Sequence, residues 1–279
     1  MLKLFKQLKP YSKQLVFVIV LLFVQTMSQL YLPTLLSKIV DTGIMNGDVN
    51  YILKIGGVMI GIALIGSACT ILASFLSSKV SMGFGRDLRR KIFTKTETFS
   101  LNEIDKVGTA SLITRTTNDV NQVQQVVIMI LRMMITAPLT CIGGIIMAIS
   151  VDKDLSLILL VSMPIVIIAI LLIGKKAMPL FKAMQVKLDN INRILRENLT
   201  GIRVIRASNK QNFEKKRFDE ANDDFTSNAI KVNKTIALLM PLLMLILNLT
   251  AVSILWFGAN RIDSGVMEVG NLMAFIQYV

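Results

Sequence analysis

The sequence predicts an all-α membrane protein with long helical extensions on the cytoplasmic side of the bilayer. Five stretches of the 279-residue chain are apolar over most of their length, and a sixth begins at Leu272. A helix that crosses a bilayer needs about 20 predominantly apolar residues, and the five stretches meet that length. A soluble helical core is the less favoured alternative, because five such runs and a mean hydropathy of +0.61 are unusual for one.

The expected spans occur in order along a single domain that covers residues 1–279. They are residues 15–36, 52–76, 126–150, 155–173, 236–259 and 272–279. The sixth reaches only about eight residues before Val279, so we expect a truncated sixth helix. The first run is longer than the apolar core of an export signal, and we therefore expect it to stay in the membrane.

Ahead of the first span, residues 1–13 alternate leucine and phenylalanine with lysine. This pattern favours a short amphipathic helix lying along the membrane surface. A plain basic flank explains the same residues equally well.

Basic residues are distributed unequally between the two sides of the membrane. Of the 31 lysines and arginines, 27 lie on the side of the N-terminal flank and the two long loops, counting Arg132 near that end of the third span; the exceptions are Lys38, Lys54, Lys153 and Arg261. Basic residues favour the cytoplasmic side, so we expect a cytoplasmic N-terminus in a multi-pass protein of a bacterial cell membrane. This asymmetry and contact with anionic lipid headgroups account for the net charge of +13 without a nucleic-acid partner.

Composition also limits the chemistry of the chain. Histidine is absent, which excludes histidine-based catalysis and zinc sites with histidine ligands, and Cys69 and Cys141 fall inside apolar spans. Gly61 and Gly66 have the spacing of a phosphate-binding loop, but Ser67 occupies the lysine position. We expect no catalytic residue, metal site or cofactor in this chain.

The first long loop, of about 50 residues, has a pattern of long helix, short helix and long helix. Apolar residues at helical spacing continue the second span as far as Phe99, and Ser100 with Glu103 forms a predicted capping box. Gly108 is expected to end the short helix in a left-handed conformation, and Thr109 to cap the next helix.

The second long loop, of about 60 residues, repeats this design. Helical periodicity is expected to break at Gly201 and again at residues 207–209, which leaves a short segment over residues 202–206. Ser208 and Gln211 form a second predicted capping box. The two short segments would lie at the tips of stalks that reach on the order of 30 Å below the membrane.

Four segments carry a resemblance to a known family. They are Arg86-Asp-Leu-Arg89, Ile113-Thr-Arg-Thr-Thr-Asn-Asp-Val120, Glu197-Asn-Leu-Thr-Gly-Ile-Arg-Val-Ile-Arg-Ala207 and Gly265-Val-Met-Glu-Val-Gly-Asn-Leu-Met-Ala-Phe275. In this order and spacing, they resemble the transmembrane domain of bacterial ATP-binding-cassette (ABC) exporters of the multidrug half-transporter type.

The resemblance implies a six-helix domain that pairs with a second exporter half as a homo- or heterodimer. It also implies that the loop tips act as coupling helices on nucleotide-binding domains, which would bind ATP and Mg²⁺ and are absent from this chain. The implied coupling residues are Asn102, Glu103, Asp105, Gly201, Arg203 and Arg206.

Candidate substrate contacts are neutral polar and methionine side chains within the spans. They are Gln25, Gln29, Met133, Met240, Met244 and Asn248. Methionine provides an adaptable apolar surface, and intramembrane amides favour a partner or a cavity. Helix packing explains the same residues.

The expected function is ATP-driven export of drugs or other lipophilic small molecules. No carboxylate lies deep in the five complete spans, which disfavours ion-coupled transport. The alternatives are a lipid or peptide ABC exporter and a regulatory or scaffold membrane protein without a motor.

Overall fold

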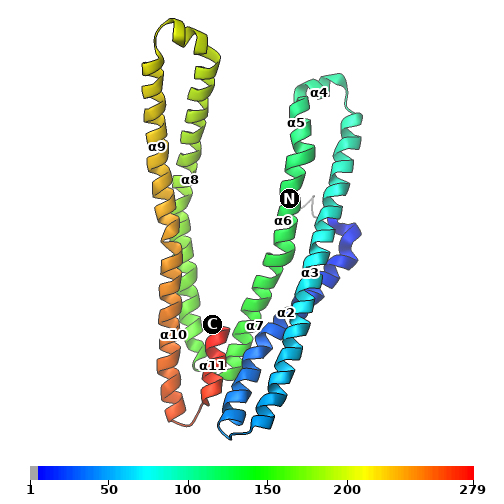
Figure 1. The fold of residues 1–279 in the computed structure, drawn as a ribbon, viewed down its shortest axis with the longest axis vertical. Coiled ribbons are helices and arrows are strands. Elements are labelled where there is room, and N and C mark those ends of the chain that lie inside the picture. Colours follow the sequence, from blue (N-terminus) through cyan, green and yellow to red (C-terminus); the bar gives the residue numbers. More distant parts are fainter. Residues whose placement is uncertain (1–5) are drawn as a thin grey trace. The chain divides into compact units, whose positions relative to one another are not determined.

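The computed structural model describes residues 6–279, and within them the chain folds as helices joined by short turns (Figure 1). It divides into two compact units. Unit 1 comprises residues up to Ser156 together with Gly258–Val279, and unit 2 comprises Leu157–Phe257. Five helical stretches in the described chain are long and apolar enough to cross a membrane. The predicted all-α fold class is confirmed.

Unit 1 contains most of the elements. In order they are η1 (Lys6–Tyr11), α2 (Ser12–Lys38), η2 (Ile39–Ile44), α3 (Val49–Glu97), α4 (Leu101–Val107), α5 (Thr109–Thr114), η3 (Arg115–Asp119), α6 (Val120–Met129), η4 (Ile130–Met134), α7 (Ile135–Val151) and α11 (Val269–Tyr278). Unit 2 is built from α8 (Ser156–Ala207), α9 (Gln211–Ala237) and α10 (Leu239–Asp263), whose end residues extend into unit 1. The segments η2, η3 and η4 are π-helical.

The α3 helix confirms that the second expected span continues without a break into the following loop. It runs for 49 residues, and its apolar first half leads into a basic second half. Two apolar clusters hold it in unit 1. One joins Ala73 to Val18 and Leu22 of α2, and the other joins Val80 and Phe84 to α6 and η4. Burial of these side chains ties the membrane part and the stalk part of α3 to one core.

The N-terminal flank differs from the expected amphipathic surface helix. Residues 1–5 of that segment lie outside the described part of the chain. From Lys6 to Tyr11 the chain forms a short 3₁₀ helix that runs directly into α2. Leu8 is buried against Val80 and Phe84, and the Tyr11 hydroxyl donates a hydrogen bond of 2.7 Å to Asp87. This apolar face therefore packs on protein.

Polar contacts join α11 to the end of α2 and to η2 in unit 1. The backbone N–H of Gly270 donates to Asp41 at 2.6 Å, and the Ser37 hydroxyl lies 3.0 Å from Asp41 and 2.9 Å from the Asn271 amide oxygen. Further along, the hydroxyls of Thr34 and Tyr278 are 2.6 Å apart. Positions increase along α2 as they decrease along α11, so the two helices are antiparallel.

In the same unit, Asp152 occupies the turn between α7 and α8. One carboxylate oxygen accepts hydrogen bonds of 2.9 Å from the N–H groups of Asp154 and Leu155, at the start of α8. The other accepts a bond of 2.8 Å from Arg261, which also donates to Asp154 at 2.7 Å. Asp152 is buried and paired, as a carboxylate removed from water must be.

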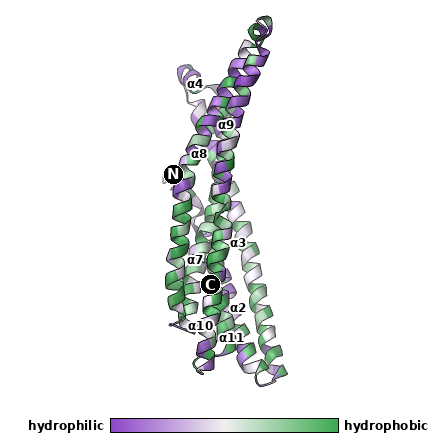
Figure 2. Cartoon of the chain, turned by 90° about the vertical axis from the view of Figure 1, so that its left-hand side faces the viewer, coloured by the Kyte–Doolittle hydropathy of each residue, from purple (hydrophilic) through white to green (hydrophobic). Residues whose placement is uncertain are grey.

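Unit 2 is a long helical hairpin whose composition changes along its length. Figure 2 shows α10 largely apolar and the far parts of α8 and α9 largely polar. Ile191 and Ile194 are buried on α8, as is Val232 on α9. A one-residue break at Leu238 separates α9 from α10, because Pro241 has no N–H to bond the carbonyl of Ala237.

Candidate functional site

The first loop tip is the seven-residue helix α4, and its predicted capping box is confirmed. The Ser100 hydroxyl accepts from the N–H of Glu103 at 3.4 Å, and the Glu103 carboxylate accepts from the Ser100 N–H at 2.8 Å. These hydrogen bonds from Ser100 lower the pKa of Glu103. Asn102 and Asp105 are exposed on the same helix, and Leu101 is 81% exposed. The tip therefore presents a preformed helix with one apolar and several polar side chains.

The end of α4 differs in detail from the expectation. Gly108 has a positive φ of 79°, as predicted, but its ψ of 134° lies outside the left-handed helical region. Thr109 is the first residue of α5 and does not cap it, so that prediction was wrong. Gly108 occupies the N-cap position, and its carbonyl accepts from the N–H of Leu112 at 3.1 Å.

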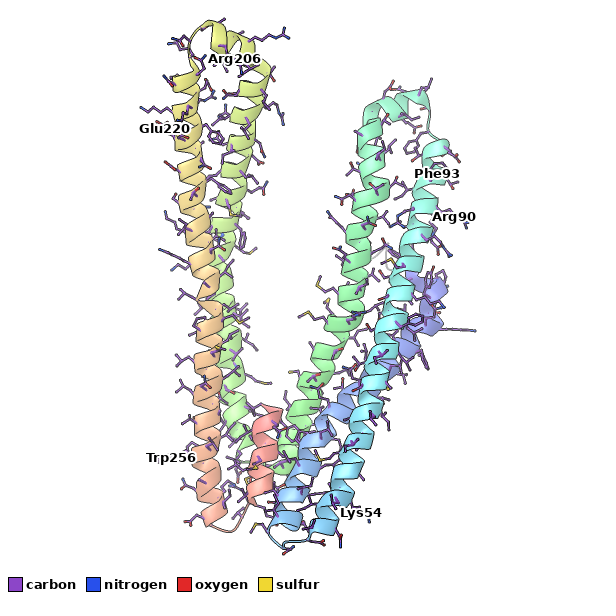
Figure 3. The ribbon with its side chains drawn as sticks, in the orientation of Figure 1. Lys54, Arg90, Phe93, Arg206, Glu220 and Trp256 are labelled. Atoms are coloured by element: carbon purple, nitrogen blue, oxygen red, sulfur yellow. The ribbon has the colours of Figure 1, made fainter. Side chains whose placement is uncertain are left out.

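The second tip contains no separate short helix. The predicted break at Gly201 was wrong, because α8 continues to Ala207. A single glycine costs a helix only about 1 kcal/mol, which is too little to interrupt a 52-residue helix. Arg203 and Arg206 are exposed on its last turns, and Figure 3 shows Arg206 at the tip of the hairpin. Val204, 69% exposed, gives this tip an apolar side chain as well.

The turn from α8 to α9 uses Asn209 in place of the predicted second capping box. Asn209 has φ +53°, and the N–H groups of Asn209 and Lys210 donate to the carbonyls of Arg206 and Ile205. This pair of bonds is the Schellman arrangement, which asparagine accommodates in the left-handed region. Ser208 thus ends α8, and the N-cap of α9 is Lys210 without a side-chain bond.

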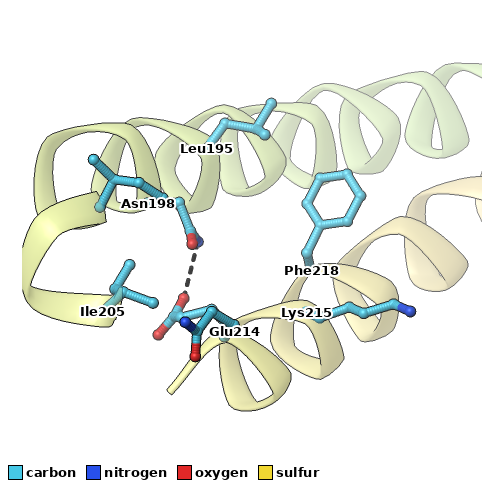
Figure 4. A pocket seen from close by; sticks show the side chains of 8 residues that line it. Leu195, Asn198, Ile205, Glu214, Lys215 and Phe218 are labelled. Carbon is cyan, nitrogen blue, oxygen red and sulfur yellow. Dashed lines mark hydrogen bonds between the residues drawn. The ribbon is translucent and has the colours of Figure 1, made fainter. Parts of the chain in front are cut away.

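Behind the second tip, α8 and α9 line a small open pocket of about 320 Å³ (Figure 4). Its lining is mainly apolar and includes Leu195, Ile205 and Phe218. The Asn198 amide donates to Glu214 across the pocket at 2.9 Å. Arg217 bonds both Glu214, at 3.4 Å, and Glu197, at 2.6 Å. Ion pairs and an amide therefore hold the two helices together close to the tip.

The first hairpin, in which α3 packs against α6, is held by hydrogen bonds around Gln124, a residue that the sequence analysis did not single out. Gln124 of α6 is buried, and its backbone carbonyl accepts from the Ser81 hydroxyl at 2.7 Å. Arg89 donates to the Gln124 side chain at 2.9 Å and to Asn121 at 2.7 Å. Gln124 falls at helical spacing between the apolar residues Val120 and Val127, and this polar residue on an apolar helix face could have indicated its role.

Three of the candidate cavity residues lie in unit 1. Gln25 and Gln29 share one face of α2; Gln29 is exposed, whereas the Oε1 atom of Gln25 is buried without a hydrogen-bond partner among the described residues. Met133 is exposed on η4. An unpaired buried amide oxygen is costly, and it marks Gln25 as a position ready to accept a hydrogen bond.

The other three candidates lie on α10 in unit 2. Met240, Met244 and Asn248 follow each other at intervals of four residues, and all three are exposed. They therefore lie on one face of α10, where two flexible methionine side chains are followed by the Asn248 amide. Among the residues that the structure describes, no cluster of three or more histidine, cysteine, aspartate or glutamate side chains is arranged to hold a metal ion.

Comparison with known proteins gives the family. The model of the ABC transporter transmembrane region matches residues 15–279. The chain belongs to this family. The predicted resemblance is therefore confirmed, and this ABC transmembrane region is a multi-pass membrane protein.

Curated relatives are bacterial ABC proteins. The region is 41% identical over 98% of its length to an uncharacterized ABC transporter ATP-binding protein of Mycobacterium tuberculosis, and 38% identical over 97% to YfiB of Bacillus subtilis, which bears the same description. A putative export ATP-binding/permease protein of Rickettsia felis is 25% identical over 99% of the region. The chain spans about half the length of these relatives, 47%, 47% and 48% respectively.

Proposed function

We propose that this region is the membrane-spanning, substrate-translocating part of an ATP-driven exporter of drugs or other lipophilic compounds. The observation that carries the proposal is that α3 and α8 run without interruption from apolar segments to exposed tips. A continuous helix transmits a displacement of its tip along its length. Movements of ATP-binding domains would then reach the membrane as rigid-body motion of the helices.

In this proposal, α4 and the last turns of α8 contact nucleotide-binding domains. Asn102, Glu103 and Asp105 provide the first contact, and Gly201, Arg203 and Arg206 the second. The names of the relatives support ATP-binding partners, because those proteins are described as ATP-binding and are about twice as long. ATP and Mg²⁺ would bind there, and ATP must favour one membrane arrangement over the other to drive transport.

The substrate would be lipophilic because the candidate cavity side chains are neutral. The amides of Gln25, Gln29 and Asn248 would orient the substrate, and Met133, Met240 and Met244 would adapt to its shape. The working unit would be a dimer of exporter halves in the bacterial plasma membrane. Its N-terminus would be cytoplasmic, in agreement with the basic residues of both hairpins.

The test reverses the charges at the second tip. In the full-length protein in lipid vesicles, Arg203→Glu with Arg206→Glu should leave ATP hydrolysis measurable but remove its stimulation by substrate, and dye efflux should fall at least about tenfold. The matched control is Arg196→Glu with Lys216→Glu, two exposed cations of the same hairpin set back from the tip. Unchanged efflux in the tip variant would refute the coupling role. Absence of ATP-dependent efflux from the parent protein, for every lipophilic dye tried, would instead favour a scaffold.

A further inference from the structure

Arg132 is a cation inside an apolar span. It lies six positions after Val126, where the third expected span begins, which corresponds to about 9 Å along the helix. Ionised side chains at such depth are costly, and they pair with an opposite charge or with backbone carbonyls. The surroundings of Arg132 are therefore informative.

The described residues offer Arg132 only neutral partners. Its Nη2 atom donates to the Ser74 carbonyl at 3.1 Å, to the Ser78 hydroxyl at 3.2 Å and to the Ser74 hydroxyl. The carboxylate preceding it on its own helical stretch is Asp119, 13 positions away or about 20 Å. On α3, Asp87 is nine positions beyond Ser78 and is bonded to Tyr11 and Arg86. The charge of Arg132 has no ion-pair partner in the described chain.

The arrangement leaves several donors unused. The Nε and Nη1 groups of Arg132 make no hydrogen bond with the described residues, and neither hydroxyl of Ser74 and Ser78 donates one. The two hydroxyls accept from the guanidinium, so their own protons are free to point toward an anion. A fixed guanidinium with two adjacent hydroxyls matches the several oxygens of a phosphate.

Neighbouring residues fix this group and provide an apolar border. Leu131 is buried in the cluster with Val80, so the π-helical segment η4 is anchored on α3. Met129, Met133 and Met134 are each more than half exposed around Arg132. A polar head would thus meet the guanidinium while hydrocarbon chains lie along methionine side chains.

We propose that Arg132, Ser74 and Ser78 form a binding site for the phosphate head of an acidic amphiphile. Two sources share this chemistry: a resident anionic phospholipid and a single-chain phosphate amphiphile that enters as cargo. The site lies wholly within unit 1 and requires no ATP. It is therefore independent of the transport proposal, and failure of either leaves the other standing.

The experiment measures bound lipid directly. The full-length protein is placed in phosphatidylcholine nanodiscs, phosphatidylglycerol is added stepwise, and native mass spectrometry counts the molecules retained. We expect one retained phosphatidylglycerol per chain whose affinity falls about tenfold or more in Arg132→Gln. Ser74→Ala with Ser78→Ala should also weaken it, although the positive charge remains.

Lys79→Gln is the matched control, because it removes an exposed cation one residue beyond Ser78 without altering the three site residues. It should leave the retained lipid unchanged. Equal retention in wild type and Arg132→Gln, or equal loss in Lys79→Gln, would overturn the proposal. Full retention in the double serine variant would also overturn the proposal, since the positive charge of Arg132 alone would then explain lipid binding.

A second arm separates the two sources. Dodecyl phosphate is added to the protein loaded with phosphatidylglycerol, and displacement is followed by the same measurement. Displacement that depends on Arg132 assigns the site to an exchangeable amphiphile. Retention of phosphatidylglycerol against excess dodecyl phosphate assigns it to a resident lipid.

Discussion

The two hairpins have similar outlines but are held together by different chemistry. In the first, Gln124 connects the helices by hydrogen bonds to the Ser81 hydroxyl and the Arg89 guanidinium, and a separately capped helix forms the tip. In the second, Arg217 pairs with Glu197 and Glu214, and one tight turn at Asn209 forms the tip. Hydrogen bonds in which at most one partner is charged depend less on salt than exposed ion pairs, which salt screens. The ionic environment should therefore affect the second hairpin more than the first.

The largest expected effect concerns close packing in the first hairpin. A Cβ atom added at Gly85 would lie 2.2 Å from the Gln124 side chain, so Gly85→Ala must displace that buried amide and its bond to Arg89. We expect a loss of about 1–3 kcal/mol of local stability, as for other overpacked sites. Hydrogen exchange over residues 78–92 and 118–128 measures it.

Gly174→Ala in α8 is the control for this substitution. No heavy atom lies within 4 Å of its added Cβ, so the change should stabilise the helix by about 0.5–1 kcal/mol. Unchanged exchange in Gly85→Ala would show that Gln124 does not organise the first hairpin.

A smaller effect distinguishes the two tips. Ser100→Ala removes the hydroxyl that accepts from the Glu103 N–H, while the Ser100 N–H can still donate to the Glu103 carboxylate, and it should cost α4 about 1 kcal/mol. Ser208→Ala should have almost no effect, because Ser208 caps no helix. The readout is amide exchange at residues 103–104 and 211–214. Comparable fraying at both tips would contradict the assigned difference.

The ionic contacts of the second hairpin should contribute less. Arg217→Met leaves Glu197 and Glu214 without their shared partner and should destabilise the hairpin slightly at low salt. In 1 M salt the difference from wild type should shrink, since the Debye length falls to about 3 Å. Exchange over residues 193–218 at both salt concentrations gives the comparison. A penalty that is independent of salt would indicate loss of packing instead.

The smallest effect is a pH dependence at the N-terminal contact of the first hairpin. The Tyr11 hydroxyl and the Arg86 guanidinium lower the pKa of Asp87. A lowered carboxyl pKa means that this contact stabilises the fold above the ordinary carboxyl pKa, and that the contribution is lost as pH falls through the lowered value.

Fluorotyrosine NMR tests this dependence. The Tyr11 resonance, assigned by its absence in Tyr11→Phe, should shift on acidification with a midpoint below that of a free aspartate. In Asp87→Asn the shift should disappear. Persistence of the shift in that variant would assign it to another group.

The sequence predicted the helices better than the junctions between them. Periodicity over tens of residues identified α3 and α8, and Ser100 with Glu103 identified α4, because each signal is local. At Gly201 and Ser208 the same local signals misled. Glycine is only about 1 kcal/mol less favourable than alanine inside a helix, so Gly201 does not interrupt α8. Asn209 ends α8 in a left-handed conformation, which replaces the predicted capping box at Ser208.

The candidate site was predictable only in part. Exposed positions such as Arg203 and Asp105 can be placed from helix order alone. Gln124 and the hydroxyls around Arg132 could not, because their roles depend on which faces of α3 and α6 meet. That register is set by packing of residues such as Phe84 and Leu131, which are far apart in sequence.

Asp152 and Arg261 have a topological consequence. The chain leaves unit 1 at Ser156 and returns at Gly258, and the bond between these two side chains spans 109 positions just outside those points. The α8–α10 segment is therefore an insertion into unit 1, and the ion pair between Asp152 and Arg261 joins its two ends into a ring without a covalent bond.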